Sequence, residues 1–349
     1  MVVKKRQIYT YNLGLSESEF LKREFSLYIT ELSYLAEQKL MKSDQFYVAT
    51  TNPLELRSIL ENCRPKSVVI FFLGNETYNV QQTQWLNQYS NKIKYAFVYN
   101  LPTKTSFKVA IKCLFGAVMD GGIFLWEGEK NIIRTFKNGI DLMKRTRKLQ
   151  ITFPHHDFPQ GYSKRFISEI MLKGIKLGER SILEIAPLII SEKKSKIGFV
   201  GQRGSWCRDL AIRAALKKNL GFAPVYTHGW GGINQGKLTA YIDSLIQSEF
   251  VLTPPGNITN RNFRYLESLV FNSIPIMPPA TLQDPHLWGI WTEYSKPLSF
   301  SWKRQINRVL RLSIMERDAI VSTALLREKK QVYEINKILD SLDKTKLVH

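Results

Sequence analysis

Cysteine is scarce in this chain, with three residues among 349. Cys63, Cys113 and Cys207 lie far apart in the sequence and are odd in number. A disulfide framework needs paired cysteines, and a structural zinc site needs closely spaced cysteines or histidines. The pattern argues against both, and it fits a reducing compartment.

Long apolar runs are also lacking. Residues 1–14, MVVKKRQIYTYNLG, become polar too soon to contain the apolar core of a secretory signal. The run SVVIFFLG has the length of a strand, and VAIKCLFGAVMDGGIFLW is interrupted by Lys112 and Asp120. Neither run contains an uninterrupted apolar stretch as long as a membrane-spanning helix needs. We therefore expect a cytoplasmic protein, with at most a peripheral contact with a membrane.

Acidic residues are few relative to basic ones, and the formal net charge is +20. Three classes of anionic partner fit this charge: nucleic acid, a membrane surface and a small substrate. The basic residues are spread along the chain, with short clusters at 144–148, 192–196 and 327–330. There is no long basic arm and no zinc-finger, RRM or KH signature, so specific nucleic-acid binding ranks third. A basic solvated surface explains the charge as well as a membrane role does.

Strand-like and helix-like segments alternate over the first half of the chain. Residues 45–50, 67–74 and 94–100 have the apolar pattern of strands, and residues 16–41 have the spacing of one helix. The segment ITFPHHDFPQGYS, residues 151–163, interrupts the pattern with prolines and histidines. Continuous apolar strands separated by helices predict a parallel α/β sheet covered on both faces.

A second α/β unit is expected from Lys196 onward, after the charged segment SEKKSK. We predict an amino-terminal domain over 1–190, a carboxy-terminal domain over 196–325 and a final helix over 326–349. Two open α/β domains in tandem place a cleft between the carboxyl ends of their sheets, which is the usual ligand site in such folds.

The stretch SEFVLTPPGNITNRNFRYLESLVFNSIPIMPP, Ser248–Pro279, sets two buried-looking strands on either side of one helix. The turn that leaves the first strand contains Pro255, Gly256 and Asn257, and the helix is expected to begin near Asn260. The stretch is either an ordinary strand–helix–strand unit or a group of polar side chains gathered at one sheet edge to hold a charged ligand.

The polar residues of this helix suit an anionic ligand. Asn260, Arg264, Glu267 and Phe271 fall on one face at helical spacing. Phe263, Leu266 and Val270 fall on another face, which we expect to be core. Free N–H groups at the helix start favour an anion. Arg261 and Arg264 offer planar forks that suit phosphate, and the Glu267 carboxylate can accept bonds from ribose hydroxyls. The alternative is a surface ion pair between Arg264 and Glu267, worth about 0.3–0.5 kcal/mol.

Two further turns follow strands of the second unit. Gly201 and Arg203 lie in the turn of KIGFVGQRGSWCRD, where backbone N–H groups can meet a phosphate or a sugar. The spacing matches neither the dinucleotide fingerprint nor a P-loop, and glycines in such turns are often purely steric. His228 and Gly229 lie in a glycine-rich loop that allows close approach to a ligand. A flexible loop with an exposed histidine is the simpler alternative.

Candidate catalytic groups in the first half are few. His156 and Asp157 lie in FPHHDFPQGY, and Asp120 lies in VMDGG. Imidazole and carboxylate are the usual general bases near neutral pH. Adjacent histidines on an extended chain point in opposite directions, so His155 and His156 make a poor metal site. A proline-rich structural loop is an equally good interpretation of the segment.

The stretch Ser248–Pro279 resembles the signature of the exostosin-like glycosyltransferases. In that family a strand and turn of the form F-x-L-x-P-x-G precede a helix of the form R-x-x-E-x-L-x-x-G-x-I-P-V. The matching residues are Phe250, Leu252, Pro254 and Gly256 in the first part, and Arg264, Glu267, Leu269, Ile274 and Pro275 in the second. Asn272 stands where the family has glycine, and Asn260 where it usually has serine. The resemblance covers residues 196–279, and the first half agrees only in general architecture.

This resemblance implies a GT-B fold: two Rossmann-like domains face each other across a cleft, and a final helix crosses back to the first. It implies an inverting, metal-independent transfer of a sugar from a nucleoside diphosphate, with a UDP-sugar as the first expectation. The acceptor would be a glycan, a polysaccharide or a lipid-linked glycan. Glu267 would bind the donor ribose. Arg264 and the helix start at Asn260 and Arg261 would hold the diphosphate, with help from Arg203.

The residues agree with this implication on separate grounds. A positive cleft with a helix start stabilises a diphosphate as it leaves. No Asp-x-Asp pair occurs, as a metal-dependent GT-A site would need. An inverting enzyme needs one base for the acceptor hydroxyl, and Asp157 or His156 is the first candidate, followed by Asp120.

Two other classes of function remain open at this point. One is a binding protein of the same fold that keeps a nucleotide or glycan pocket without a base. The other is a basic nucleic-acid-binding protein, for which a carboxylate such as Glu267 in the site has no use.

Overall fold

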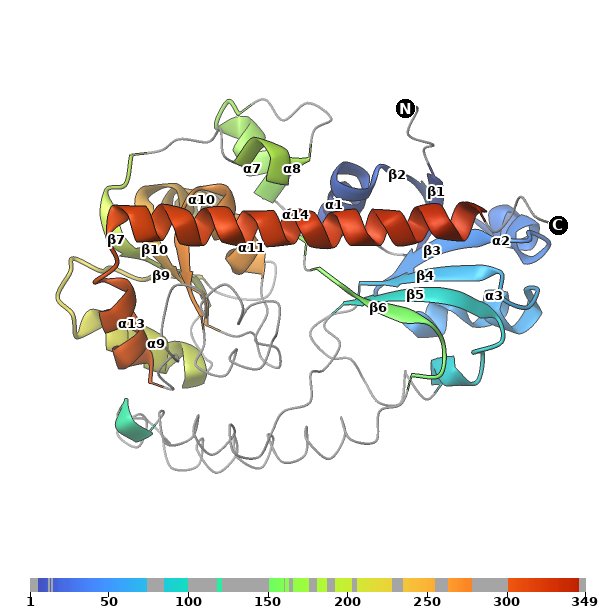
Figure 1. Ribbon diagram of the computed structural model, residues 1–349, viewed down its shortest axis with the longest axis horizontal. Helices are drawn as coiled ribbons and strands as arrows, with labels where there is room; N and C mark the ends of the chain where they lie inside the picture. The colour runs from blue at the N-terminus through green and yellow to red at the C-terminus, as the bar shows by residue number, and fades with distance from the viewer. Residues whose placement is uncertain are drawn as a thin grey trace.

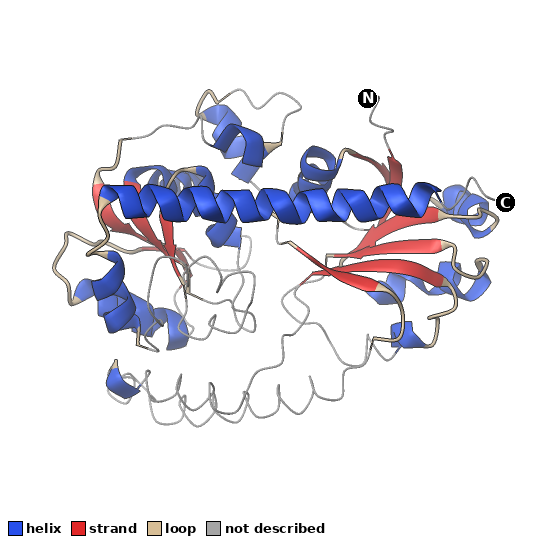
Figure 2. Cartoon of the chain, in the orientation of Figure 1, coloured by secondary structure: helices blue, strands red, loops and turns tan. Residues whose placement is uncertain are grey.

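The chain folds as a mixed α/β protein in the computed structural model (Figure 1). The structure describes residues 6–11, 13, 15–73, 85–99, 118–120, 151–159, 161–162, 166–175, 181–186, 192–202, 206–227, 235–254, 263–277 and 301–344. Parallel strands from the two halves of the chain form separate sheets, each accompanied by helices (Figure 2). The predicted α/β class is confirmed, and the two-domain GT-B arrangement stays a prediction.

The first half of the chain forms a six-stranded parallel sheet. Its strands are β1 (Arg6–Tyr11), β2 (Leu27–Glu31), β3 (Phe46–Thr50), β4 (Val68–Phe72), β5 (Ile93–Tyr99) and β6 (His155–Phe158). They lie in the order β2-β1-β3-β4-β5-β6. The connecting elements include α1 (Leu15–Phe25), α2 (Tyr34–Met41), the 3-10 turn η1 (Pro53–Leu56) and α3 (Arg57–Asn62). The strand order reverses between β1 and β3, as in doubly wound sheets.

Both faces of this sheet are buried at its central strands, because every residue of β3 and β4 is buried and all of them except Thr50 are apolar. Successive residues of β3 and β4 alternate between two apolar cores. Tyr47, Val69 and Phe71 belong to one core, and Val48 and Ile70 belong to the other. Continuous burial on both faces is why an unbroken apolar run predicted the position of β4 correctly.

The prediction of one helix over residues 16–41 is wrong. Helix α1 ends at Phe25, and Ser26 has a φ of 52° in the left-handed region. A residue in that region cannot continue a right-handed helix. The β-branched residues Ile29 and Thr30 then form part of the edge strand β2 instead.

The interpretation of FPHHDFPQGY as a loop is also wrong in part, because β6 lies within it and pairs with β5 at the sheet edge. Phe158, at the end of β6, is fully buried, and its ring lies 5.0 Å from that of Phe25 and 5.6 Å from that of Phe71. Pro154 and Pro159 flank the strand, and proline is confined to strand ends and edges. The prolines therefore mark the ends of a short edge strand.

The second half of the chain contains a smaller set of parallel strands. β7 (Ser195–Gly198), β10 (Ser248–Leu252) and β11 (Ile274–Ile276) form one sheet in the order β11-β10-β7. β8 (Val200–Gln202) pairs with β9 (Val225–Thr227). Only Phe199 separates the end of β7 from the start of β8. We therefore treat β7 and β8 as one strand, which has β10 on one side and β9 on the other. The strand order therefore reverses between β7 and β10.

The helices of this half surround those strands. They are α9 (Trp206–Leu216), α10 (Gln235–Gln247), α11 (Phe263–Val270), α13 (Trp302–Val309) and α14 (Ile314–Lys344). The short helices α7 (Phe166–Leu172) and α8 (Ile182–Ile185) precede them in the chain. Helix α14 begins before residue 326, where the final segment was expected to start.

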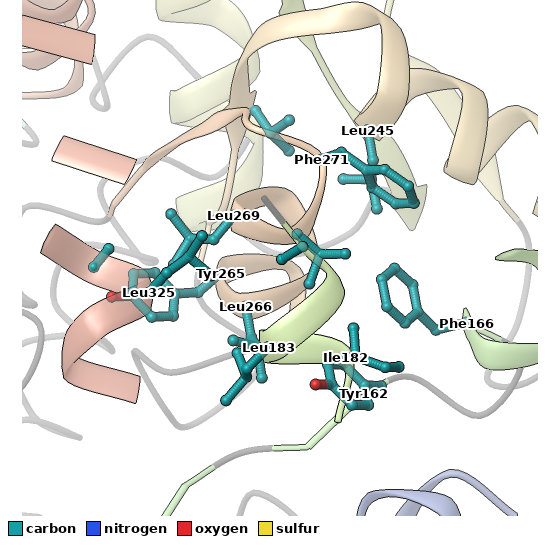
Figure 3. Close-up of a cluster of buried hydrophobic side chains, with 14 of the residues drawn as sticks. Tyr162, Phe166, Ile182, Leu183, Leu245, Tyr265, Leu266, Leu269, Phe271 and Leu325 are labelled. Atoms are coloured by element: carbon teal, nitrogen blue, oxygen red, sulfur yellow. The ribbon is translucent and has the colours of Figure 1, made fainter. Parts of the chain in front are cut away.

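Helix α11 is enclosed by apolar side chains from several elements (Figure 3). Leu266 of α11 and Phe271, just after it, lie in one cluster with Phe166 of α7 and Leu325 of α14. The rings of Phe166 and Phe271 are 5.8 Å apart. Every residue from 264 to 270 is buried. Leu266 and Val270 are buried, as expected for the core face, and the polar residues Arg264 and Glu267 are buried as well.

Helix α14 lies beside both groups of strands (Figure 1). Its 31 residues span about 46 Å at 1.5 Å per residue. Near its start Arg317 pairs with Glu249 of β10. Near its end Asp343 accepts bonds from Arg6 of β1, at 2.7 Å from Nε, and from the hydroxyl of Tyr47. Polar contacts at both ends thus join α14 to the two sheets. No helix in the described ranges is long and apolar enough to cross a membrane.

We predict that Asp343 stabilises the fold more than its neighbour Asp340 does. Asp343 contacts both Arg6 and Tyr47, whereas Asp340 contacts Arg6 and is itself 62% exposed. Loss of Asp343 deprives a buried guanidinium of one partner, so Asp343→Ala should lower the free energy of unfolding by about 1–3 kcal/mol. Asp340→Ala should cost less than about 1 kcal/mol. Urea unfolding of the two variants measures both values, and equal losses would contradict the prediction.

Candidate functional site

Arg264 is a buried cation in the first turn of α11. The residue is only 9% exposed. The guanidinium carbon lies 5.5 Å from the ring centre of Phe199, 5.9 Å from that of Tyr241 and 5.8 Å from that of Phe263. The faces of aromatic rings attract cations, so these three rings offset part of the cost of burying the charge.

The rings leave the hydrogen-bonding capacity of Arg264 unused. Its Nε atom is buried without an acceptor, and among the described residues the side chain forms no ion pair. A guanidinium has five N–H donors and stays charged in proteins. A buried guanidinium with unfilled donors is suited to a planar or tetrahedral anion such as carboxylate or phosphate.

Gly201 of β8 leaves the space that this guanidinium occupies. A Cβ atom at residue 201 would lie 2.6 Å from a terminal nitrogen of Arg264 and 3.1 Å from the ring of Phe199. Protein interiors are close-packed, so such an atom would displace the arginine or the ring. Gly201 therefore has a steric role toward Arg264, whereas the sequence had suggested a backbone contact with a ligand.

Glu267 lies one turn after Arg264 and is fully buried. The hydroxyl of Tyr241, on α10, donates a hydrogen bond to its carboxylate. Burial and the neighbouring Glu267 carboxylate raise the pKa of Tyr241 well above its ordinary value, so this phenol stays a donor. The Tyr241 ring thus contacts the cation on one side, and its hydroxyl holds the carboxylate.

The surface ion pair between Arg264 and Glu267, the simple alternative for this motif, is not present. Both residues are buried, and among the described residues no pair within 4 Å joins the two. Two opposite charges have been buried on one helix without neutralising each other directly. An ordinary surface helix does not explain that arrangement.

These residues lie at the reversal of strand order in the second half. β7 and β10 run side by side, with Gly198 opposite Val251. Gly201 lies three positions beyond Gly198, at the carboxyl end of this pair, and α11 is the helix that follows β10. In open α/β sheets, ligands bind outside the carboxyl ends of the strands at such a reversal. The buried cation therefore lies where an anionic ligand is expected.

Most of the other predicted donor-site residues lie outside the described residues. They are Arg203, His228, Gly229, Pro255, Gly256, Asn257, Asn260 and Arg261. The described part of the predicted donor site is Gly201, Arg264 and Glu267, and the structure brings Gly201 and Arg264 into direct contact.

His156 and Asp157, the predicted bases, are neighbours on β6. They are opposite Phe97 and Val98 of β5, and both are half-buried. Adjacent strand residues point to opposite faces of a sheet, so only one of the two can face a given ligand. The carboxyl end of β6 lies on the side of the first sheet that is turned toward the second (Figure 1).

Asp120, the third candidate base, holds the start of α13. Its carboxylate accepts bonds from the hydroxyl of Ser301 and from the backbone N–H groups of Trp302, at 2.6 Å, and Lys303, at 3.2 Å. Burial raises the pKa of Asp120 above its ordinary value, against these bonds. Three donors at a helix start give this carboxylate a structural role, so we leave it out of the catalytic proposal.

Glu24 is a buried acid that the sequence did not single out. It accepts bonds from Tyr162, at 2.9 Å, from the hydroxyl of Ser181 and from the backbone N–H of Ile182, at 3.0 Å. Burial raises its pKa above the ordinary value. Glu24 follows the helical charge pattern of α1, so only its contacts with residues distant in sequence reveal its role. These contacts join α1 to the start of α8.

In the segments that the structure describes, no group of three or more histidine, cysteine, aspartate or glutamate side chains is placed to hold a metal ion.

Tyr241 and Phe199 contact Arg264, but their sequence pattern did not single them out as site residues. Both look like ordinary core positions, and their contact with Arg264 depends on pairing between distant segments.

No known protein family and no curated protein matches the sequence of this chain. Among solved structures, one similar chain is a mutant, metal-free periplasmic metal binding protein from Candidatus Liberibacter asiaticus. It shares 9% sequence identity, the match covers 92% of this chain and 100% of that chain, and the TM-score is 0.18. At that TM-score the likeness supports no argument about this chain.

We predict that Asp120 can be replaced by asparagine but not by alanine. Asparagine keeps an oxygen that accepts bonds at a helix start, and alanine does not. Asp120→Asn should therefore change the free energy of unfolding by less than about 1 kcal/mol, and Asp120→Ala should lower it by about 1–2 kcal/mol. Chemical unfolding measures both. An alanine variant as stable as the unchanged protein would refute the capping role and return Asp120 to the catalytic candidates.

Proposed function

We propose that this chain is a glycosyltransferase that moves a sugar from a nucleoside diphosphate donor to a glycan or polysaccharide acceptor. The observation that carries the proposal is the buried guanidinium of Arg264, which has unfilled donors and lies at the reversal of strand order. The resemblance of Ser248–Pro279 to the exostosin-like signature supplies the reaction class. Arg264 and Glu267 both belong to this signature, and both are buried in the structure.

Arg264 would bind the diphosphate of the donor. As the bond between the anomeric carbon and the diphosphate breaks, the electron pair moves to the leaving oxygen and negative charge grows there. The diphosphate is already anionic in the donor, and a fixed cation in a site shielded from water stabilises it more strongly as this further charge develops. Phe199 and Tyr241 keep the guanidinium in place before the ligand arrives, so little reorganisation is needed.

Glu267 would accept bonds from the ribose hydroxyls of the donor. The bond from Tyr241 to this carboxylate orients it, and the high pKa of Tyr241 keeps that donor protonated. In this proposal Tyr241 is a positioning residue for both charged groups of the site.

One base completes an inverting mechanism. Asp157 or His156 would take the proton of the acceptor hydroxyl while that oxygen attacks the anomeric carbon from the face opposite the diphosphate. The products are the glycoside, the nucleoside diphosphate and the protonated base, which later returns its proton to water. The proposed donor is a UDP-sugar, and the proposed acceptor is a glycan or polysaccharide.

We expect UDP to stabilise the protein through Arg264. Thermal unfolding is measured with UDP, GDP, CMP, ADP and dTDP, and one nucleoside diphosphate should raise Tm selectively, by an amount equivalent to about 2.7 kcal/mol at a hundred times Kd. Arg264→Lys keeps the charge but loses the fork, and Gly201→Ala crowds the guanidinium, so both should raise Kd at least about tenfold. Arg213→Lys, on α9, is the matched control and should bind as the unchanged protein does.

Turnover separates an enzyme from a binding protein of the same fold. With the selected nucleotide sugar, Asp157→Asn or His156→Gln should lower kcat by about 10²–10⁴ while Kd for the nucleoside diphosphate stays constant. Binding without release of nucleoside diphosphate, in the presence of any glycan acceptor, would favour the binding protein. No shift with any nucleotide in a folded protein would overturn the proposal.

A further inference from the structure

A dense group of basic side chains lies on α9, α13 and the residues that follow each helix. These two helices pack against each other. Residues 206–218 contain four basic residues and one acid, Asp209, and residues 301–313 contain four basic residues and no acid. We define the basic face as Arg213, Lys217, Lys218, Lys303, Arg304 and Arg311.

The amphipathic character of α13 turns its charges outward. Trp302, Ile306 and Val309 are buried on one side of the helix. Lys303 and Arg304 on the helix, with Arg311 after it, are exposed. Because the apolar side is committed to the core, the charged side cannot turn inward.

The charges of the basic face are not neutralised within the described part of the chain. Its six side chains form no ion pair there, whereas cations elsewhere do: Arg6 pairs with Asp343, and Arg317 pairs with Glu249. The nearby Asp120 carboxylate forms no ion pair with the Lys303 side chain, and it accepts bonds from the Ser301 hydroxyl and from the backbone N–H groups of Trp302 and Lys303. A surface that gathers cations without acidic partners is complementary to an anionic partner.

Exposed apolar side chains accompany this charge. Val118 is 37% exposed and Met119 is 52% exposed. They directly precede Asp120, whose carboxylate accepts bonds from the backbone N–H groups of Trp302 and Lys303, so they lie near the start of α13. On α9, Leu216 is 49% exposed and is followed by Lys217 and Lys218.

We propose that the basic face docks on a lipid bilayer with anionic headgroups, and that Val118, Met119 and Leu216 enter the headgroup boundary. Peripheral membrane binding combines attraction of Lys and Arg to anionic lipid with burial of a few apolar side chains. The basic face supplies the charge, and Val118, Met119 and Leu216 supply the exposed apolar side chains. This proposal concerns a surface separate from Arg264 and does not depend on the donor site.

The apolar neighbours favour a bilayer over nucleic acid. Proteins that hold single strands stack bases on exposed aromatic rings. Among the described residues, the strongly exposed aromatic side chains include Tyr28, Tyr34 and Tyr333, and these lie on β2, α2 and α14. Exposed aliphatic side chains beside cations contribute to bilayer binding and add little to phosphate contacts along a nucleic acid.

The test is cosedimentation of the full chain with vesicles of phosphatidylcholine that contain 0 or 30% phosphatidylserine. Binding should require phosphatidylserine and should weaken as salt is raised. The triple variant Lys303→Gln, Arg304→Gln, Arg311→Gln should bind at least about tenfold more weakly. Lys39→Gln, Lys42→Gln, Lys66→Gln removes the same charge from exposed positions of the first half and should bind as the unchanged chain does.

A second variant tests the apolar contribution. Val118→Ser with Met119→Ser should weaken vesicle binding severalfold while binding to a generic DNA duplex, measured in parallel, is unchanged. Thermal unfolding establishes that each variant is folded. The proposal is overturned if phosphatidylserine vesicles do not retain the protein, if the two triple variants lose binding equally, or if duplex DNA alone binds the basic face.

Discussion

A guanidinium does not give up its charge inside a protein, and Arg264 is nine-tenths buried. Its surroundings must therefore compensate a permanent cation in the interior. Three aromatic rings compensate the charge in part, and Gly201 provides the space for the guanidinium. Within the described residues, no carboxylate forms an ion pair with Arg264. Proteins rarely keep a buried charge with unfilled donors unless it binds something. The features around α11 are most simply understood as a site prepared for an anion.

The scaffold keeps that site rigid. Residues 264–270 of helix α11 are all buried, and the helix packs against side chains of α7, α8 and α14 (Figure 3). Helix α14 is joined to β10 at its start and to β1 at its end, so the elements near the site are also linked to the first sheet. Helix α9 follows β8, which carries Gly201, and α9 also carries part of the basic face. Docking through that face would hold the anion site close to a bilayer, where a lipid-linked acceptor would be found.

Much of the architecture was predictable because local pattern and burial agree. Most positions of the buried parallel strands are apolar, so β3, β4, β5 and β10 were recognised from sequence. The strand β2 was not, because helical spacing of apolar residues on either side concealed it and only the left-handed Ser26 separates it from α1. Arg264 and Glu267 were found from their motif and from chemistry. Phe199, Tyr241 and the contact of Gly201 with Arg264 were missed because these depend on strand pairing between distant segments.

The central claim is that the buried guanidinium is a diphosphate site. The most direct test is a crystal structure of the full chain with bound UDP. The account predicts the diphosphate within hydrogen-bond distance of the Arg264 guanidinium, at the carboxyl ends of β8 and β10. A diphosphate bound elsewhere, with Arg264 still enclosed by its three rings and without a new partner, would contradict it.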